Sequence, residues 1–249
     1  MSKKVIVSFS SKGREDYNAA QLGLIKSCVN AGWDGDYYIR SYDGYCDNYL
    51  GVDIKLGSYP ITKRHGLCNN HSEIPWGFKP NLILEAIEKG SYEQIVWCDS
   101  TIRMVGDIQP LLDIAKERGV VAFNNEGHPL YKWITDVALE HAGITEQELM
   151  ANNIKQIMAC CIIFDVSNQQ GKVVFEEWLR LSRDGVSFQN GYSSKREGFI
   201  ASRNDQACLS AILWKKGIEL EPYGKLVYPP HDLTKEYGEE IYFVNKGVN

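Results

Sequence analysis

The feature that most constrains this chain is a short apolar run that stops abruptly on a single acid. Residues 95–102 read Ile-Val-Trp-Cys-Asp-Ser-Thr-Ile, so the run ends at Asp99 and two small hydroxyl residues follow. An apolar run of this length is typical of a central strand that is buried on both faces. Open α/β sheets bind ligands outside the carboxyl ends of their strands, which makes Asp99 the first candidate for a ligand site. The alternative is that the Asp99 side chain caps the turn after the strand.

Other apolar runs alternate with stretches of helical periodicity along the whole sequence. We expect strands at 4–10, 37–42, 94–98, 120–123, 158–164 and 226–228, and helices at 17–31, 81–89, 110–118, 130–142, 146–153, 173–183 and 205–216. This alternation predicts one α/β domain with a central, mainly parallel sheet flanked by helices. Residues 43–73 lack clear periodicity and are expected to be mostly loop, and 184–202 form a second long, polar loop.

Composition limits the partners and the compartment that we expect. The net charge of −5 and a pI near 5.6 argue against binding to nucleic acid or to an anionic membrane surface. The seven cysteines form no Cys-x-x-Cys pair, which favours reduced thiols in the cytoplasm. No apolar stretch approaches the ~20 residues of a membrane span, and the first apolar run is too short for a signal peptide. We therefore expect a soluble, cytoplasmic protein.

Two motifs flank the strand that ends at Asp99. Trp76-Gly77-Phe78-Lys79-Pro80 leads into the helix before the strand, and Asp107-Ile108-Gln109-Pro110-Leu111 begins the helix after it. In this order of motifs the chain resembles the centre of GT-A type nucleotide-sugar glycosyltransferases. The resemblance implies a single GT-A type, Rossmann-like domain over residues 1–249. Its nucleotide-binding half would cover about 1–105 and its acceptor-side half about 106–249.

In that superfamily the strand ends in an Asp-x-Asp element that holds a divalent metal and the diphosphate of the donor. Here the position of the second acid is occupied by Thr101. The resemblance implies that Mn²⁺ or Mg²⁺ is held by Asp99, with Thr101 beside the metal and diphosphate. It also implies His231 as a second metal ligand, because many GT-A enzymes carry a late histidine there; the alternative is an exposed loop histidine. A magnesium ion usually takes one or two carboxylates together with phosphate oxygens and waters.

The stretch from Val5 to Ser27 resembles the opening of glycogenin-like enzymes, in which a strand and a turn lead to a tyrosine at a helix start. There the tyrosine stacks on uracil, and small polar residues at the end of the first strand contact the base or ribose. Carried over, the resemblance implies that Tyr17, Ser8 and Ser10 bind the nucleotide, and that the donor is a UDP-sugar. Tyr17 could instead pack the helix on the sheet.

Lys79 lies before a proline at a helix start, where backbone donors already favour anions. A lysine there would add a point charge for a phosphate group, whereas the alternative is an ordinary surface lysine. The related W-K-P motif is familiar from glycosyltransferase-like proteins of phages and large viruses. The resemblance therefore leaves open a phage protein made in the host cytoplasm.

Asn204-Asp205-Gln206 opens the helix at 205–216 and resembles the N-D-Q element of retaining GT-A galactosyl- and glucosyltransferases. The resemblance implies two catalytic residues: Asp205 on hydroxyls of the sugar or acceptor, and Gln206 near the anomeric carbon. The alternative is that Asn204 caps the helix and Asp205 suits its dipole. The basic residues Lys195 and Arg196, with Arg203 nearby, could close over a diphosphate or belong to a solvated loop.

These observations lead to one hypothesis and two alternatives. The hypothesis is transfer of a sugar from a nucleoside diphosphate donor to an acceptor hydroxyl on a glycan, a small molecule or modified DNA. Retention follows if Gln206 lies under the anomeric carbon and inversion follows if Asp205 deprotonates the acceptor; we favour retention. One alternative is a phage-type enzyme that glycosylates hydroxymethylated DNA bases. The other is a non-catalytic nucleotide-sugar binding protein, suggested by the incomplete Asp-x-Thr element.

Overall fold

The structure is a computed structural model that describes residues 3–10, 15–41, 48–49, 52–53, 57–58, 76–227 and 241–247. His231 and most of the expected loop at 43–73 lie outside these residues. Three short strands of that loop are described: β3 (Asn48–Tyr49), β4 (Val52–Asp53) and β5 (Gly57–Ser58). The antiparallel pair β3–β4 forms a small sheet of its own.

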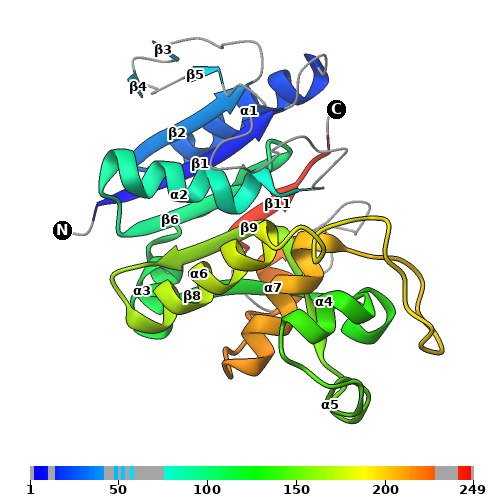
Figure 1. The fold of residues 1–249 in the computed structure, drawn as a ribbon. Helices are drawn as coiled ribbons and strands as arrows, with labels where there is room; N and C mark the ends of the chain where they lie inside the picture. The colour runs from blue at the N-terminus through cyan, green and yellow to red at the C-terminus, as the bar shows by residue number, and fades with distance from the viewer. Residues whose placement is uncertain are drawn as a thin grey trace.

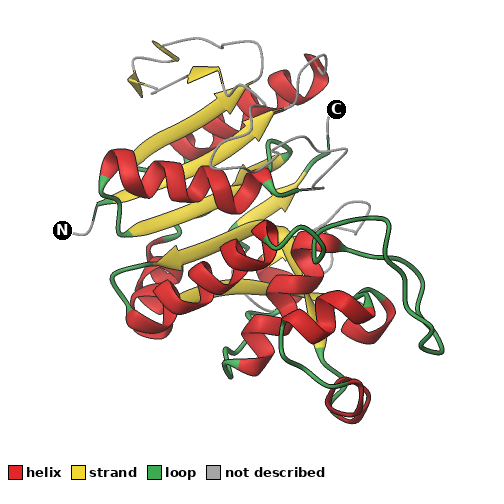
Figure 2. Cartoon of the chain, viewed as in Figure 1, coloured by secondary structure: helices red, strands yellow, loops and turns green. Residues whose placement is uncertain are grey.

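A six-stranded sheet forms the centre of the molecule (Figures 1 and 2). Its order is β5, β2 (Asp36–Ser41), β1 (Lys4–Ser10), β6 (Gln94–Cys98), β9 (Lys155–Asp165) and β8 (Val120–Pro129). The pairs β5–β2, β2–β1 and β1–β6 are parallel, whereas β9 runs antiparallel to both of its neighbours. Because β8 therefore runs in the direction of β6, β9 alone is reversed. The expected mainly parallel sheet is confirmed.

Helices cover both faces of this sheet. One face carries α2 (Phe78–Gly90), α6 (Gln169–Arg183) and α7 (Asn204–Lys215), which lie in front of the sheet in Figure 1, and the other carries α1 (Glu15–Asn30) and α3 (Gln109–Arg118). The side chains of a strand alternate between these layers. In β6, Ile95 and Trp97 join the first core and Val96 and Cys98 join the second. Burial on both faces explains the unbroken apolar run before Asp99.

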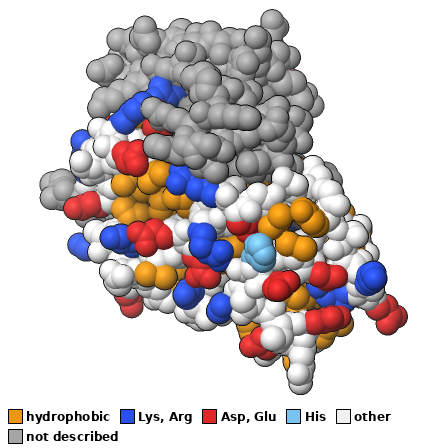
Figure 3. All heavy atoms as spheres, in the orientation of Figure 1, with side chains coloured by type: hydrophobic (Ala, Val, Ile, Leu, Met, Phe, Trp, Pro, Cys, Tyr) orange, Lys and Arg blue, Asp and Glu red, His pale blue; other side chains and the backbone are white. Residues whose placement is uncertain are grey.

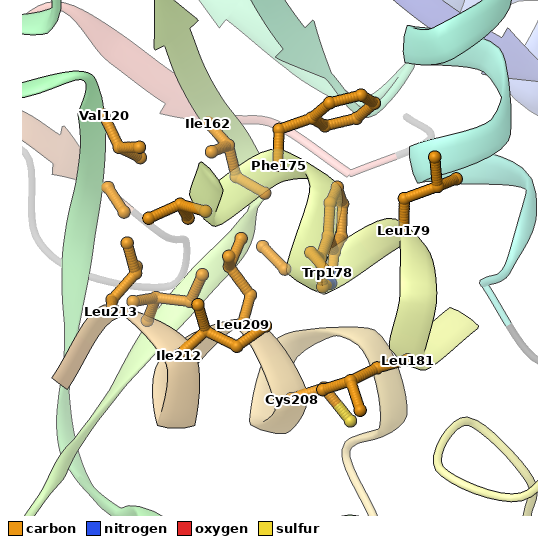
Figure 4. Packing of buried hydrophobic residues seen from close by; sticks show 14 of the residues in the cluster. Val120, Ile162, Phe175, Trp178, Leu179, Leu181, Cys208, Leu209, Ile212 and Leu213 are labelled. Carbon is orange, nitrogen blue, oxygen red and sulfur yellow. The ribbon is translucent and has the colours of Figure 1, made fainter. Parts of the chain in front are cut away.

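The core between α6, α7 and the sheet fixes the start of α7. Figure 4 shows Phe175 and Trp178 of α6 packed with Leu209 and Ile212 of α7. Trp178 is fully buried, and its indole Nε1 donates a hydrogen bond of 3.0 Å to the backbone carbonyl oxygen of Asp205. A buried indole contributes both a large apolar area and one directed hydrogen bond. The first turn of α7 is therefore held by the core itself.

Several expected elements have different bounds in the structure. The helix expected at 130–142 is a 3₁₀ turn, η1 (Leu130–Lys132), followed by the short helix α4 (Asp136–His141), because Thr135 interrupts it as the N-cap and accepts from the backbone N–H of Ala138. A second cap with a full capping box, at Thr145, begins α5 (Glu146–Ala151). Strands β8 and β9 are longer than expected, and their register shifts near Asn124.

A second, three-stranded sheet contains β7 (Ile102–Met104), the strand that follows Asp99 in the chain. It consists of β10 (Leu226–Val227), β11 (Phe243–Asn245) and β7, of which only the first was expected. None of the described helices is long and apolar enough to cross a membrane. Acidic and basic side chains are interspersed over the described part of the face drawn in Figure 3, as the modest net charge leads one to expect.

Candidate functional site

Asp99 lies where the sequence predicts it, at the carboxyl end of β6. Its backbone N–H donates to the carbonyl oxygen of Cys160 at 2.8 Å, and its own carbonyl accepts from Ile102 at 2.9 Å, which closes a tight turn into β7. The indole of Trp97 donates to Asp99 Oδ1 at 2.8 Å. Within the described part of the chain no N–H of the turn bonds to this carboxylate, which argues against the capping alternative. The side chain is 34% exposed, and its Oδ2 has no hydrogen-bond donor among those residues.

Lys79 joins Asp99 to a second carboxylate. From the first turn of α2, its Nζ lies 3.3 Å from Asp99 Oδ1 and 3.0 Å from Asp205 Oδ2, and it donates to the carbonyl oxygen of Ala159 at 2.9 Å. The lysine side chain is only 4% exposed. Burial alone would lower the pKa of this ammonium, but Asp205 and then Asp99 more than offset that effect and raise the pKa above its usual value. Lys79 is therefore a buried, charged link between α2, β6 and α7.

The first turn of α7 presents the other two candidate residues. Asp205 is almost fully buried, with a side chain that is 6% exposed, and its ion pair with Lys79 lacks the alignment of a hydrogen bond. Gln206 is half-buried, and its Nε2 has no hydrogen-bond acceptor among the described residues. The alternative interpretation of Asn204 as the N-cap of this helix is wrong, because Asn204 is already the first residue of α7. Its φ is +31°, and its amide holds the preceding loop by donating to the carbonyl oxygen of Phe188.

Four of the predicted side chains meet in one cavity of about 690 Å³. Lys79, Asp99, Asp205 and Gln206 line it together with residues from the end of β8, from the chain before α7 and from Tyr223. This volume lies within the ~300–1,000 Å³ that is typical of small-molecule sites. The cavity opens at the carboxyl edge of the sheet, the edge at which α/β folds bind their ligands.

The predicted nucleotide contacts lie near this edge but do not line the cavity. Ser8 and Ser10 are buried at the end of β1 and face α1, where Ser10 Oγ donates to Asn18 Oδ1 at 2.5 Å. Gln21 Nε2 donates to Ser8 Oγ at 3.4 Å. Tyr17 is half-buried in the first turn of α1. The described residues therefore tie both serines to the helix that carries Tyr17.

The described residues supply one ligand for a divalent metal. No group of three or more histidine, cysteine, aspartate or glutamate side chains is placed to hold a metal within the described ranges. Asp99 Oδ2 is available, and Thr101 is half-buried in the turn beside it, with its carbonyl bonded to the N–H of Lys246. The thiol of Cys160 also lines the cavity, but burial raises its pKa, so it stays protonated. A metal here would need donor phosphates, waters or His231 to complete its shell.

Sequence reasoning missed three residues of another wall of the cavity: Asn125, Glu126 and His128, which reach it from the irregular end of β8. Arg203, which the sequence analysis grouped with the basic loop, reaches the cavity from the position before α7. Arg203 lies over the ring of Trp133, with 4.7 Å between the guanidinium carbon and the ring centroid. Nothing in residues 124–129 has strand periodicity, so this wall had no signal in the sequence.

Arg196 does not close over the cavity. Its side chain is only 2% exposed, and it donates to the carbonyl oxygens of Tyr131 at 2.9 Å and Ile134 at 3.3 Å and pairs with Asp136 at 2.8 Å. A buried arginine with three such partners is an anchor for its own backbone. It fastens the 184–203 segment, yellow in Figure 1, to η1 and α4.

Fold and cavity together define a mixed α/β domain with a Rossmann-like sheet and one polar site at its carboxyl edge. No family model matches the chain, and no curated protein matches it in sequence. Among the solved structures that match is the apo structure of WbbM, a bifunctional glycosyltransferase, with a TM-score of 0.58 and 15% sequence identity. The match covers 98% of this chain and 45% of that chain, so the present sequence spans less than half of that protein. The chain therefore has the fold of a glycosyltransferase.

Proposed function

We propose that this chain transfers a sugar from a nucleoside diphosphate sugar, specifically a UDP-sugar, to an acceptor hydroxyl, with a single GT-A type domain. Residues 1–105 would form the nucleotide half and residues 106–249 the acceptor half. The observation that carries the proposal is the meeting of Lys79, Asp99 and Asp205 in one cavity at the carboxyl edge of a glycosyltransferase fold. Three elements far apart in the sequence each bring one charged side chain to a single ligand-sized space.

The electrostatics of this group suit a sugar better than a bare phosphate. The charge of Lys79 is already paired with two carboxylates, so it supplies little free positive charge to an anion. Its role in the proposal is to hold both carboxylates in place, with Asp205 towards the sugar and Asp99 Oδ2 towards the donor. Charged hydrogen-bond acceptors of this kind bind sugar hydroxyls strongly. The phosphate charge would then fall to a metal on Asp99 and to groups outside the described residues.

A divalent metal, Mn²⁺ or Mg²⁺, fits the proposal if the donor contributes phosphate oxygens. Asp99 would hold the ion, with Thr101 beside it and His231 as a further ligand. When bound, such an ion stabilises negative charge on the departing diphosphate. Ser8, Ser10 and Tyr17 would position the nucleotide at the end of β1, next to β6 in the sheet.

The burial of Asp205 favours retention of configuration. A general base for inversion must reach the acceptor hydroxyl and accept its proton. Asp205 is almost fully buried and ion-paired, and so it is poorly placed for that task. In the proposed reaction the bond from the anomeric carbon to the diphosphate breaks and the bond to the acceptor oxygen forms on the same face. The acceptor proton passes to an oxygen of the leaving diphosphate, while Gln206 faces the anomeric carbon.

A binding panel tests the proposal. The melting temperature is measured with UDP-, GDP-, dTDP-, ADP- and CMP-sugars, each with Mn²⁺, Mg²⁺ or EDTA, because a ligand of the folded state raises it by mass action. We expect a shift of several degrees with UDP-sugars and a metal, and loss of that shift in Asp99→Ala. Asp113→Ala, which removes an acid from α3 outside the cavity, is the matched control. No shift with any donor would refute the proposal.

Product analysis separates the proposed reaction from its two alternatives. Proton NMR of the product reports whether the anomeric configuration is retained. Binding without any hydrolysis or transfer would identify a non-catalytic nucleotide-sugar binding protein. Transfer to DNA that contains hydroxymethylated bases, with activity that falls steeply as salt rises, would identify the phage-type DNA enzyme.

A further inference from the structure

Lys79 and Arg203 are the two lysine or arginine side chains among the described residues that line the cavity, and they differ in burial and in ion pairing. Lys79 is buried and paired with Asp99 and Asp205. Arg203 is exposed, and its guanidinium has no hydrogen-bond acceptor or ion-pair partner in the described part of the chain. Its positive charge is therefore available to a ligand, whereas that of Lys79 is already neutralised.

Arg203 is also held in one orientation. Its backbone N–H donates to the carbonyl oxygen of Trp133 at 3.0 Å, and its guanidinium lies over the indole of the same residue at 4.7 Å. The ring of His128 also packs against Trp133, with 5.6 Å between the two ring centroids. An arginine stacked on an aromatic ring loses little further freedom when it binds, and its fork of N–H donors matches a carboxylate or a phosphate.

The position of Arg203 places this fork on the acceptor side of the site. In the sheet the order runs from β2 and β1, where the nucleotide is proposed, through β6 with Asp99 to β9 and β8. Arg203 lines the cavity from the position before α7, and His128 lines it from β8; both lie on the side of Asp99 away from β1 and β2. A ligand that fills the cavity from Asp205 towards β8 therefore meets Arg203 at the end remote from β1.

We infer that Arg203 binds an anionic group, a carboxylate or a phosphate monoester, on the acceptor that receives the sugar. This inference rests on the proposed function and names its acceptor class: an acidic sugar or another polyol with one anionic group near the receiving hydroxyl. Asn125 and His128 lie on the same wall and would contact the neighbouring hydroxyls. The exposed carboxylate of Glu126 on this wall disfavours an acceptor with a second anionic group.

The test compares three sugars that differ only in the group at C6: glucose, glucuronate and glucose 6-phosphate. Their dissociation constants are measured by calorimetry on the full chain saturated with UDP and Mn²⁺. We expect the two anions to bind about tenfold more tightly than glucose, the effect of one charge-assisted hydrogen bond. Arg203→Met should abolish this preference, and Arg203→Lys, which keeps the charge without the fork, should retain only part of it. Lys195→Met is the matched control, because Lys195 is exposed in the same loop and does not line the cavity.

Three results besides equal binding of the three sugars would overturn the inference. One is an equal preference for the anions in Arg203→Met and Lys195→Met. Another is full retention of the preference in Arg203→Lys. The third is tighter binding of the anions to the chain without UDP than to the UDP-saturated chain, which would place the anions in the donor site. If UDP binding depends on Asp99 while the three sugars bind alike, the inference fails and the proposed function stands. If UDP itself does not bind, the proposed function fails.

Discussion

Replacing Lys79 by methionine removes the buried cation and keeps most of the side-chain volume. Asp99 is one-third exposed and can turn to water, but Asp205 is almost fully buried. The cost therefore arises chiefly at Asp205, which is left as a buried carboxylate without a counter-charge. Breaking one side of such a pair costs about 3–5 kcal/mol. For a chain of this size each kcal/mol lowers the melting temperature by about 2–4 °C, so we expect a fall of roughly 10 °C.

The stability loss in Lys79→Met should depend on pH, and the protonation of Asp205 determines in which direction. Burial raises the pKa of the Asp205 carboxyl, and Lys79 opposes that effect. Without Lys79, the pKa of Asp205 in the folded state lies above its unfolded value of about 3.9, so the protonated form favours folding and that contribution is lost as pH rises. The stability difference between Lys79→Met and the wild type should therefore be largest at pH 7 and smallest near pH 4–5. In the wild type the pKa of Lys79 is raised, so its contribution is fully present below its unfolded pKa of about 10.4 and should not change between pH 6 and 9.

Urea denaturation of single and double variants measures these effects. Lys79→Met combined with Asp205→Asn should recover about 2 kcal/mol, because the buried charge is gone. Lys79→Met combined with Asp99→Asn is the matched control and should recover little, because Asp99 is already exposed to water. A loss below ~1 kcal/mol for Lys79→Met that does not vary with pH would refute the reasoning, since Asp205 would not then be a buried charge.

Further predictions concern the scaffold around the site. Arg196→Met should cost about 1–3 kcal/mol by leaving buried carbonyl groups unsatisfied, and should speed limited proteolysis within 184–203; unchanged cleavage would contradict the anchoring role. Gly171→Ala should cost about 1–3 kcal/mol in urea denaturation, because a Cβ there would overlap the backbone of Gly119 and Asp165. Gly191→Ala, with open space around it, should be nearly neutral, and equal effects at the two glycines would contradict this packing.

The central strands and Asp99 could be predicted because their signals are local. A strand buried on both faces reads as an unbroken apolar run, and the acid that ends β6 marks the edge of the sheet. The convergence of Lys79 and Asp205 on Asp99 followed only from the resemblance of short motifs, and nothing in the spacing of residues 79, 99 and 205 indicates it. The burial of Lys79 could not be predicted either, because a buried lysine and an exposed one look alike in sequence.

The errors have physical causes of two kinds. The expected helix at 130–142 passed over Thr135, a cap whose signal was present in the sequence. The second kind of error concerns the cavity wall that contains Arg203, because tertiary contacts decide which side chains reach that wall. Arg196 and Arg203 lie seven residues apart in one polar segment, yet Asp136 and two carbonyl groups bury the first, while Trp133 holds the second in an exposed position. The residues that decide between these outcomes lie in η1, in α4 and between them, about 60 positions earlier in the chain.

Release of UDP from a UDP-sugar tests the central claim most directly, because it requires both the donor site and the chemistry. The donor selected by the binding panel is incubated with the wild type, Asp99→Asn and Asp205→Asn, and free UDP is followed by ³¹P NMR with glucose 6-phosphate as acceptor. We expect steady release by the wild type and a loss of at least about 100-fold in both variants, with Asp113→Asn unaffected. Undiminished release in Asp99→Asn and Asp205→Asn, with both variants folded, would contradict the assignment of this cavity as the site of sugar transfer.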